Sequence, residues 1–409
     1  MKNMIHLFIM GFVALVTIIA CNKKSQSTVP MTFDHNRMIV EGKIQKKDGS
    51  WRTVRIWVDS GNPTFFISAP LAHDLGYDLT ANESDPQGPK NIPVEAPKQF
   101  KIGNFVIDTT GVPAVVMYGP FWMFSTFNFD INLPSTILQK YHIVCDYPDK
   151  KFTIAKPGSV TPRGTPVSMS VKPETGIIQI DAVIDGEAFS FALDAGSSYS
   201  FMSEERVAEL IKKHADWQNV TGTLSYANMW GWWRPEEDKI PVIRIPSLEW
   251  GGVKIDGAGI TGIAKYPQKD GISLGEWYSR KTQKPVDGFL GTNVLKAFRI
   301  EIDYIKNLVY FEKGAPFDTT ELDTVGVSLR QLPEGTYEVI GVVKKDGKAV
   351  ISGIEQGDLL VKIGTFETKG KTMGQVGDAL RGKPGDIRSL LLERKGKQFT
   401  LEVKIEHLL

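Results

Sequence analysis

The chain has 409 residues, which is long enough for two or three domains with buried cores. Its 48 lysine and arginine residues nearly balance its 47 aspartate and glutamate residues, for a formal net charge of +1. A surface that binds nucleic acid needs clustered cations, so this balance argues against nucleic acid as the main partner.

The first residues have the features of a secretory signal. Lys2 precedes an apolar stretch that ends at Cys21 and is short for a membrane-spanning helix. The end of this stretch resembles the bacterial lipobox, in which the cysteine is acylated and becomes the mature N-terminus. The resemblance implies a signal peptide over residues 1–21, a polar tether over residues 22–30, and a lipid-anchored envelope protein that faces the periplasm or the cell exterior. A plain signal peptide or a short anchor is the alternative.

Beyond the tether, short runs rich in Val, Ile, Phe and Thr alternate with turn residues, which is typical of β-rich domains. Strands are predicted in the first half within residues 38–45, 53–59 and 105–117, and in the second half within residues 177–186 and 189–194. The best predicted helix begins at Ser203, which can cap it, and has acidic residues in its first turn. A shorter counterpart begins at Ser68.

One phrase occurs twice in the chain, as IWVDSGNPTFFIS over residues 56–68 and as FALDAGSSYSFMS over residues 191–203. A second pair of similar segments follows, beginning at Pro134 and at Gly291. An internal repeat of this length indicates two homologous β-rich lobes, over residues 31–157 and 158–315.

The repeated phrase places one aspartate in each lobe, Asp59 and Asp194, on a tight turn that contains a glycine. Two carboxyl groups held close together cannot both ionise easily, so they share a proton. One can then deprotonate a water molecule while the other polarises a carbonyl group, which hydrolyses an amide without a covalent intermediate. Glycine lets backbone amides approach the carboxylates.

On these motifs, the two lobes resemble aspartic peptidases of the pepsin and retropepsin type, in the retropepsin-like form found in bacterial envelope proteins. The resemblance covers roughly residues 31 to 315 and implies a mainly β fold with two acid-protease-like β-barrel lobes. It also implies an endopeptidase without cofactor or metal, in which Asp59 and Asp194 share the catalytic water. The residues that it assigns to the support of the active site are Ser60, Gly61, Asn62, Gly196, Ser197 and Gly291.

The match to the family pattern is incomplete at two places. In the family, the residue after each aspartate hydrogen-bonds across to the other lobe; Ser60 can do this and Ala195 cannot. Ser197 matches the hydroxyl residue that supports the outer oxygen of its aspartate, and Asn62 could donate its amide in the first lobe. Phe289-Leu290-Gly291 fits the element that packs behind the catalytic turn, but the first lobe has Asn132-Leu133-Pro134, where proline removes a backbone donor.

Such peptidases close a flap over the substrate. By its position in the second lobe, the flap candidate comprises Met229, Trp230, Gly231, Trp232 and Trp233. The alternative is a loop whose tryptophans pack on the surface of their own lobe. The histidines show no metal-ligand spacing, and Cys145 alternates with core-like positions, so neither a zinc site nor a catalytic cysteine is expected.

The character of the sequence changes after residue 315. Residues 322–406 resemble a PDZ domain, through ISGIEQGDLL at residues 351–360 and LRGKPGDIRSLLLERKGK at residues 380–397, with a helix from about Thr372 to Leu380. PDZ domains bind extended peptides, often C-termini, along a sheet edge. The resemblance implies a carboxylate-binding loop and a groove strand at Val325, Gly326, Val327 and Leu329. A domain that only packs against the lobes is the alternative.

These features predict an envelope-anchored aspartic endopeptidase whose PDZ domain binds substrate or partner peptides. The competing hypothesis is a catalytically inactive, peptide-binding scaffold that acts through its PDZ domain, and a weaker one is an assembly or signalling adaptor. Ala195 and Pro134 favour the scaffold, whereas Gly291 and the retention of both aspartates favour the enzyme. Two lobes in one chain mean that no dimer is needed to complete the site.

Overall fold

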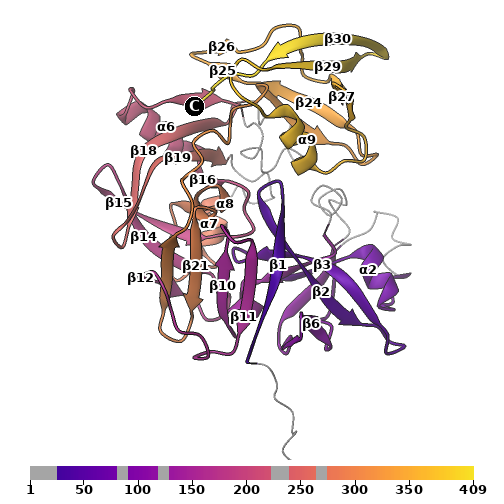
Figure 1. The fold of residues 1–409 in the computed structure, drawn as a ribbon, viewed down its shortest axis with the longest axis vertical. Coiled ribbons are helices and arrows are strands. Elements are labelled where there is room, and N and C mark those ends of the chain that lie inside the picture. Colours follow the sequence, from indigo (N-terminus) through magenta and orange to yellow (C-terminus); the bar gives the residue numbers. More distant parts are fainter. Residues whose placement is uncertain (1–24, 81–90, 118–128, 223–238, 264–273) are drawn as a thin grey trace, which may run out of the picture.

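The computed structural model describes residues 25–80, 91–117, 129–222, 239–263 and 274–409 (Figure 1). These residues form three sheets of 14, 10 and 6 strands, joined by a few short helices. The prediction of a mainly β protein built from two β-rich lobes is confirmed. None of the helices in the described ranges is long and apolar enough to cross a membrane.

The first lobe is built from a run of strands interrupted by two short helices. In the third strand, Val54, Ile56 and Val58 are buried and alternate with more exposed residues, as one face of a half-buried sheet requires. The elements are β1 (Gln26–Asp34), β2 (Arg37–Gln45), β3 (Trp51–Asp59), β4 (Phe65–Ser68), α2 (Ala69–Asp74), β5 (Ile92–Glu95), β6 (Phe100–Ile102), β7 (Phe105–Ile107), β8 (Pro113–Met117), β9 (Ile131–Pro134), α5 (Ser135–Leu138), β10 (His142–Asp146) and β11 (Lys151–Ala155).

The second lobe repeats this order and contains the longer helix that the sequence predicts at Ser203. The Ser203 hydroxyl accepts a hydrogen bond from the Arg206 amide, and Val207 and Leu210 face the core. The elements are β12 (Thr165–Ser168), β13 (Ser170–Val171), β14 (Ile178–Ile184), β15 (Glu187–Leu193), β16 (Ser200–Ser203), α6 (Glu204–Lys213), β17 (Asn219–Thr221), β18 (Pro241–Trp250), β19 (Val253–Ile263), α7 (Leu274–Ser279), β20 (Gly288–Leu290), α8 (Thr292–Leu295), β21 (Phe298–Asp303) and β22 (Leu308–Lys313).

The strand pairings show that the internal repeat is also a structural repeat. In the first lobe, β3 pairs in parallel with β9 and β4 in parallel with β8. In the second, β15 pairs in parallel with β20 and β16 in parallel with β19. Asp59 is the last residue of β3 and Asp194 directly follows β15, and each of these strands pairs with the strand that leads into the second repeated segment.

A sheet shared by the lobes joins them, through antiparallel pairing of β10 with β21. The order β12-β22-β21-β10-β11-β1 continues it on both sides, and Figure 1 shows β21, β10, β11 and β1 next to one another. Residues 26–30, predicted as part of a flexible tether, instead form the first half of β1 and pair with β11. The edge of β11 provides hydrogen-bond partners for the backbone of this polar segment, and nothing within the segment itself indicates them.

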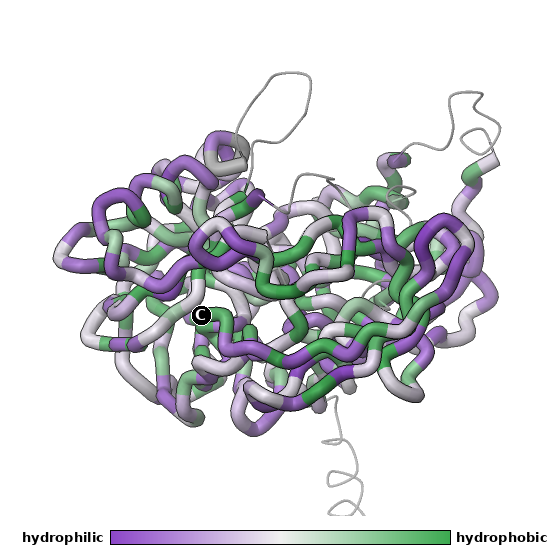
Figure 2. The backbone as a smooth tube through the Cα atoms, turned by 90° about the horizontal axis from the view of Figure 1, so that it is seen from above, coloured by the Kyte–Doolittle hydropathy of each residue, from purple (hydrophilic) through white to green (hydrophobic). Residues whose placement is uncertain are grey.

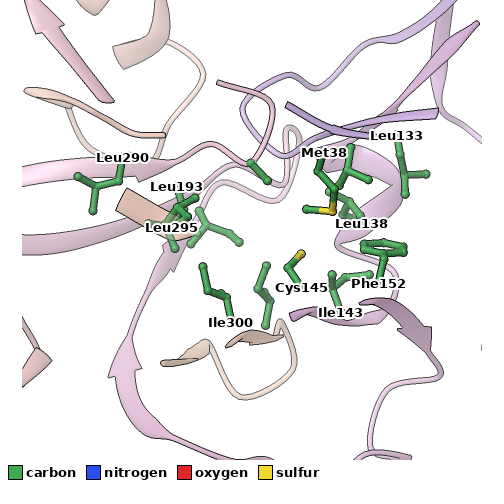
Figure 3. Close-up of a cluster of buried hydrophobic side chains, with 14 of the residues drawn as sticks. Met38, Leu133, Leu138, Ile143, Cys145, Phe152, Leu193, Leu290, Leu295 and Ile300 are labelled. Atoms are coloured by element: carbon green, nitrogen blue, oxygen red, sulfur yellow. The ribbon is translucent and has the colours of Figure 1, made fainter. Parts of the chain in front are cut away.

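One hydrophobic core runs through both lobes. In Figure 3, Met38, Leu133 and Phe152 of the first lobe lie on one side of the cluster, and Leu193 and Leu290 of the second lie on the other. Cys145 is a free thiol buried between them, and burial raises its pKa to about 12. The polar stretches gather in peripheral turns, as Figure 2 shows, while apolar stretches follow the strands through the interior.

The residues after the lobes form a six-stranded sheet and a helix with a hydrophobic core of their own. Thr372 caps this helix through a capping box with Gln375, at the place where the sequence predicts the helix to begin. The elements are β23 (Val327–Gln331), β24 (Tyr337–Val342), β27 (Leu359–Ile363), β28 (Phe366–Glu367), α9 (Met373–Leu380), β29 (Ile387–Arg394) and β30 (Lys397–Lys404). We call this part the third unit.

The third unit is attached to the second lobe by strand pairing and by a buried ion pair. Two short strands, β25 (Lys344–Lys345) and β26 (Lys348–Ala349), extend the sheet of the second lobe beside β17. The Arg244 guanidinium, on β18, contacts the buried Glu321 carboxylate at 3.1 Å and donates to the backbone oxygens of Thr319 and Leu409. These contacts hold the connecting segment against the second lobe.

Candidate active site

The two aspartate turns face each other at the junction of the lobes. Asp59 is 3 % exposed and Asp194 is 6 % exposed. A Cβ atom on Gly61 would lie 2.4 Å from the Cγ atom of Asp194, and one on Gly196 would lie 2.6 Å from the Oδ1 atom of Asp59. Each glycine therefore lies directly against the aspartate of the other lobe, and a side chain at either position would separate the two turns.

Ser60 links the lobes behind the two aspartates. Its hydroxyl donates to the backbone oxygen of Leu193 at 2.8 Å and accepts from the amide of Ala195 at 2.9 Å. Ala195 has no hydroxyl with which to form the equivalent contact in the other direction. The side-chain link across the pseudo-twofold axis is thus made from the first lobe alone.

The turn of the second lobe is held by backbone groups around Asp194. The amide of Gly196 donates to Asp194 Oδ1 at 2.8 Å. The Ser197 hydroxyl, predicted to support an outer oxygen of this carboxyl, donates to the backbone oxygen of Tyr199 at 2.6 Å, while its amide contributes to lowering the pKa of Asp194. Gly291 donates its amide to the Ser200 hydroxyl at 2.9 Å and begins α8 behind the turn.

The amide that supports Asp59 comes from Asn132, on β9, and not from the predicted Asn62. Asn132 Nδ2 donates to Asp59 Oδ2 at 3.1 Å, and its Oδ1 accepts from the amide of Phe66 at 2.6 Å. The Oδ1 atom of Asn62 accepts from the amide of Thr64 within its own turn. The sequence sets position 132 apart, because a polar asparagine stands where the second lobe has a phenylalanine, but it does not indicate that the partner of Asn132 is Asp59.

Pro134 is accommodated behind the turn of the first lobe. It is the last residue of β9, opposite Asp59, and precedes α5. The next residue, Ser135, donates both its amide and its hydroxyl to the backbone oxygen of Asn62, at 2.9 and 3.0 Å. In the second lobe the amide of Thr292 donates to the backbone oxygen of Ser197 in the same way, so this bond is common to both lobes and does not replace the donor that proline lacks.

Burial raises the pKa values of both aspartates. Burial is the main cause for Asp59, whose pKa lies well above its usual value, and the charge of Asp194 adds to it. Burial also raises the pKa of Asp194 to about 6, and the amide of Gly196 and the charge of Arg37 oppose this rise. Two neighbouring carboxyls with raised pKa values can share one proton, and the pair then contains one acid and one base.

Two cationic residues that the sequence did not identify lie close to the pair. Arg37 begins β2 and is 3 % exposed; burial lowers its pKa to about 9, and the charge of Asp194 is the largest opposing influence. Burial likewise lowers the pKa of Lys281 to about 8, against the charge of Asp59. Both residues are far from the repeated phrase in sequence, so no local pattern connects them to it.

The remaining predicted site residues are placed as follows. The flap candidate, Met229 to Trp233, and the lipidation candidate, Cys21, lie outside the described residues. Val327 and Leu329 lie on β23, at the edge of the sheet of the third unit. The amides predicted to receive a peptide carboxylate are partly engaged, since Val325 donates to the oxygen of Leu380 and Val327 to that of Val325.

The described residues contain no group of three or more histidine, cysteine, aspartate or glutamate side chains that could hold a metal ion. No protein-family model and no curated protein matches this sequence. Among solved structures, the aspartic proteinase from Irpex lacteus is similar, with a TM-score of 0.40 and 12% sequence identity over 72% of this chain and 98% of that one.

Proposed function

We propose that this protein is an aspartic endopeptidase that hydrolyses peptide bonds with a water molecule held between Asp59 and Asp194. The observation that carries the proposal is the contact of each glycine of the two turns with the aspartate of the opposite lobe. Buried carboxyls with raised pKa values at such a junction are suited to general acid and base catalysis.

The two carboxyls have different roles in the proposed reaction. Asp194 has the more extensive amide support, so the ionised form is assigned to it and the shared proton to Asp59. Asp194 accepts a proton from the water, whose oxygen attacks the peptide carbonyl carbon, while Asp59 donates its proton to the carbonyl oxygen. Collapse of the tetrahedral intermediate breaks the C–N bond as a proton passes from Asp194 to the leaving nitrogen and one hydroxyl of the intermediate returns a proton to Asp59, which restores the starting state of the pair.

Asn132 and Ser60 position the reacting groups. The amide of Asn132 holds one oxygen of Asp59, so the carboxyl keeps a fixed orientation. The hydroxyl of Ser60 fixes the distance between the two turns, because it bonds to the backbone on both sides of Asp194. Such preorganisation removes the need for the carboxyls to find each other during the reaction.

The third unit and the N-terminus complete the proposal. We propose that the third unit is a PDZ domain that binds a substrate or partner peptide along β23, whose position at the edge of its sheet supports strand addition. We also propose that Cys21 is lipidated and anchors the protein to the bacterial envelope, on the strength of the lipobox-like sequence alone.

A peptide-binding scaffold without catalysis is the second candidate. It is favoured by Ala195, which leaves the side-chain link directly behind the two aspartates dependent on the hydroxyl group of Ser60. In this case the third unit would carry the function, and the lobes would support it.

The test is digestion of an unbiased peptide mixture by the full-length protein at about pH 4, 6 and 8 in water enriched in oxygen-18, followed by mass spectrometry. The proposal predicts new C-termini that each contain one solvent oxygen. It also predicts that a peptide with a non-hydrolysable tetrahedral hydroxyl group in place of the amide inhibits the reaction, as a mimic of the intermediate. Absence of new termini at every pH would leave the scaffold as the better account.

A further inference from the structure

The tip of the β1–β2 hairpin lies where all three parts of the molecule meet. Asp34 and Arg37 are cross-strand partners, joined by a two-residue turn in which His35 and Asn36 have φ values of 48° and 59°. Two positive φ values are characteristic of the tight hairpin turn that matches the twist of its strands. Because directly paired residues project on one face of a hairpin, Asp34 and Arg37 share a side.

Arg37 brings a positive charge to the two aspartates. Its guanidinium contacts the Nδ1 atom of His35 at 2.6 Å and lies 5.9 Å from the ring centre of Trp57. The indole of Trp57 donates to the backbone oxygen of Gly196 at 3.1 Å, in the turn of the second aspartate. The turn is held against the second lobe as well, because Asn36 Nδ2 donates to the backbone oxygen of Ser198 at 3.2 Å.

Asp34 connects the same hairpin to the third unit. Its Oδ1 atom accepts a hydrogen bond from the amide of Gly374, in the first turn of α9, at 3.1 Å. Figure 1 shows the end of β1 pointing toward α9 across the gap between the first lobe and the third unit. A Cβ atom on Gly374 would lie 2.3 Å from the amide nitrogen of His35 and 2.4 Å from Asp34 Oδ1, so helix and hairpin tip are in close contact.

We propose that this hairpin couples the third unit to the catalytic pair: α9 fixes Asp34, and the paired Arg37 favours the ionised form of the aspartates. A displacement of α9 would then change the pH range in which the pair holds a single proton. The predicted effect on peptide cleavage rests on the proposed function. The predicted shift in the titration of the two carboxyls does not depend on whether the protein cleaves peptides.

Several charged or titratable groups act on the same site and have to be considered together. Arg37 opposes the rise in the pKa of both aspartates, so its removal is expected to raise both values. Other groups that face the hairpin tip and the pair are Arg55, Thr372 and Tyr337 at Asp34, His35 at Arg37, Lys281 and Asn132 at Asp59, and Tyr147 at Asp194.

The test uses the full-length protein with carbon-13 in its aspartate carboxyls, titrated by NMR from about pH 3 to 9, beside the pH profile of peptide cleavage. Arg37→Gln should move the titration of Asp194 upward by about one pH unit, the lower end of the effect of a nearby cation. Arg37→Lys, which keeps the charge, should restore most of the wild-type value. An Arg37→Gln protein that titrates like the wild type would overturn the proposal.

The coupling between the third unit and the catalytic pair is tested with variants of α9. Gly374→Ala favours the helix by about 1 kcal/mol but places a methyl group against the hairpin tip, so it should shift the same titration upward by a smaller amount. Gln375→Ala is the control, because it alters the same turn of α9 by removing a capping bond but adds no atom against the hairpin tip, so it should shift the titration less than Gly374→Ala does. Equal titrations for the two variants would overturn the coupling.

The two proposals can fail separately. If the wild type cleaves no peptide and the carboxyl titrations still shift as described, the peptidase proposal fails and the electrostatic coupling stands. If cleavage occurs and its acidic limb is the same in the wild type and in Arg37→Gln, the coupling fails and the peptidase proposal stands.

Discussion

Ser60 has one hydroxyl group that joins the two lobes behind the aspartates, and Ser60→Ala removes both of its hydrogen bonds. The bonds are 2.8 and 2.9 Å long and the residue is 4 % exposed, so water cannot replace the hydroxyl. The backbone oxygen of Leu193 and the amide of Ala195 would be left buried without this partner. Each such group costs about 1–3 kcal/mol, so the variant should lose about 2–6 kcal/mol of unfolding free energy.

The assay is urea unfolding of the full-length protein, followed by tryptophan fluorescence, with Ser159→Ala as the control. Ser159 is also a serine that donates to a backbone oxygen, that of Lys156, but it is exposed, so its replacement should change the unfolding free energy by less than about 0.5 kcal/mol. A Ser60→Ala protein as stable as the control variant would refute the idea that this hydroxyl holds the lobes together.

Further predictions concern the carboxyl pair and the joint with the third unit. Asn132→Ala should destabilise the protein by about 2–4 kcal/mol in urea unfolding, because it leaves the half-buried amide of Phe66 and the buried carboxyl of Asp59 without their partner, and should raise the pKa of Asp59 in an NMR titration. Cleavage should decline as the pH falls below about 6, because Asp194 then takes up a proton and the base is lost; a rate that keeps rising toward pH 4 would contradict this assignment. Folding raises the pKa of Asp194 from 3.8 to about 6, so proton binding by this carboxyl stabilises the folded protein. This stabilisation is complete below pH 3.8 and is lost as the pH rises through 6. The melting temperature of the wild type should therefore fall relative to that of Asp194→Asn between these two pH values. Arg244→Met leaves the buried Glu321 carboxylate without its ion-pair partner and should lower the unfolding free energy by about 3–5 kcal/mol, whereas an unchanged value would show that this ion pair is not needed at the joint.

Features encoded locally could be predicted from the sequence. The repeated aspartate turns, the helix that begins at Ser203 and the helix capped by Thr372 each depend on residues within a few positions of one another. The burial of Cys145 followed from its place in an alternating strand. Local patterns of this kind were sufficient for the mainly β class and for the duplicated lobes.

Features that depend on long-range pairing could not be predicted. Asn132 reaches Asp59 only because β9 lies beside β3 in one particular register, which the sequence of β9 does not specify. Arg37 reaches the pair because a hairpin tip projects between the lobes and the third unit. The strand at residues 26–30 exists because β11 presents an edge, although Pro30 and polar neighbours argued for a flexible segment.

The central claim is that Asp59 and Asp194 form one active site, and the most direct test compares peptide cleavage by the wild type, Asp59→Asn and Asp194→Asn between about pH 3 and 8. The account predicts that the wild type cuts peptides and that each variant loses this activity while its circular dichroism spectrum remains that of the wild type. If the wild type cuts nothing at any pH, or if either folded variant cuts as fast as the wild type, the shared active site does not exist.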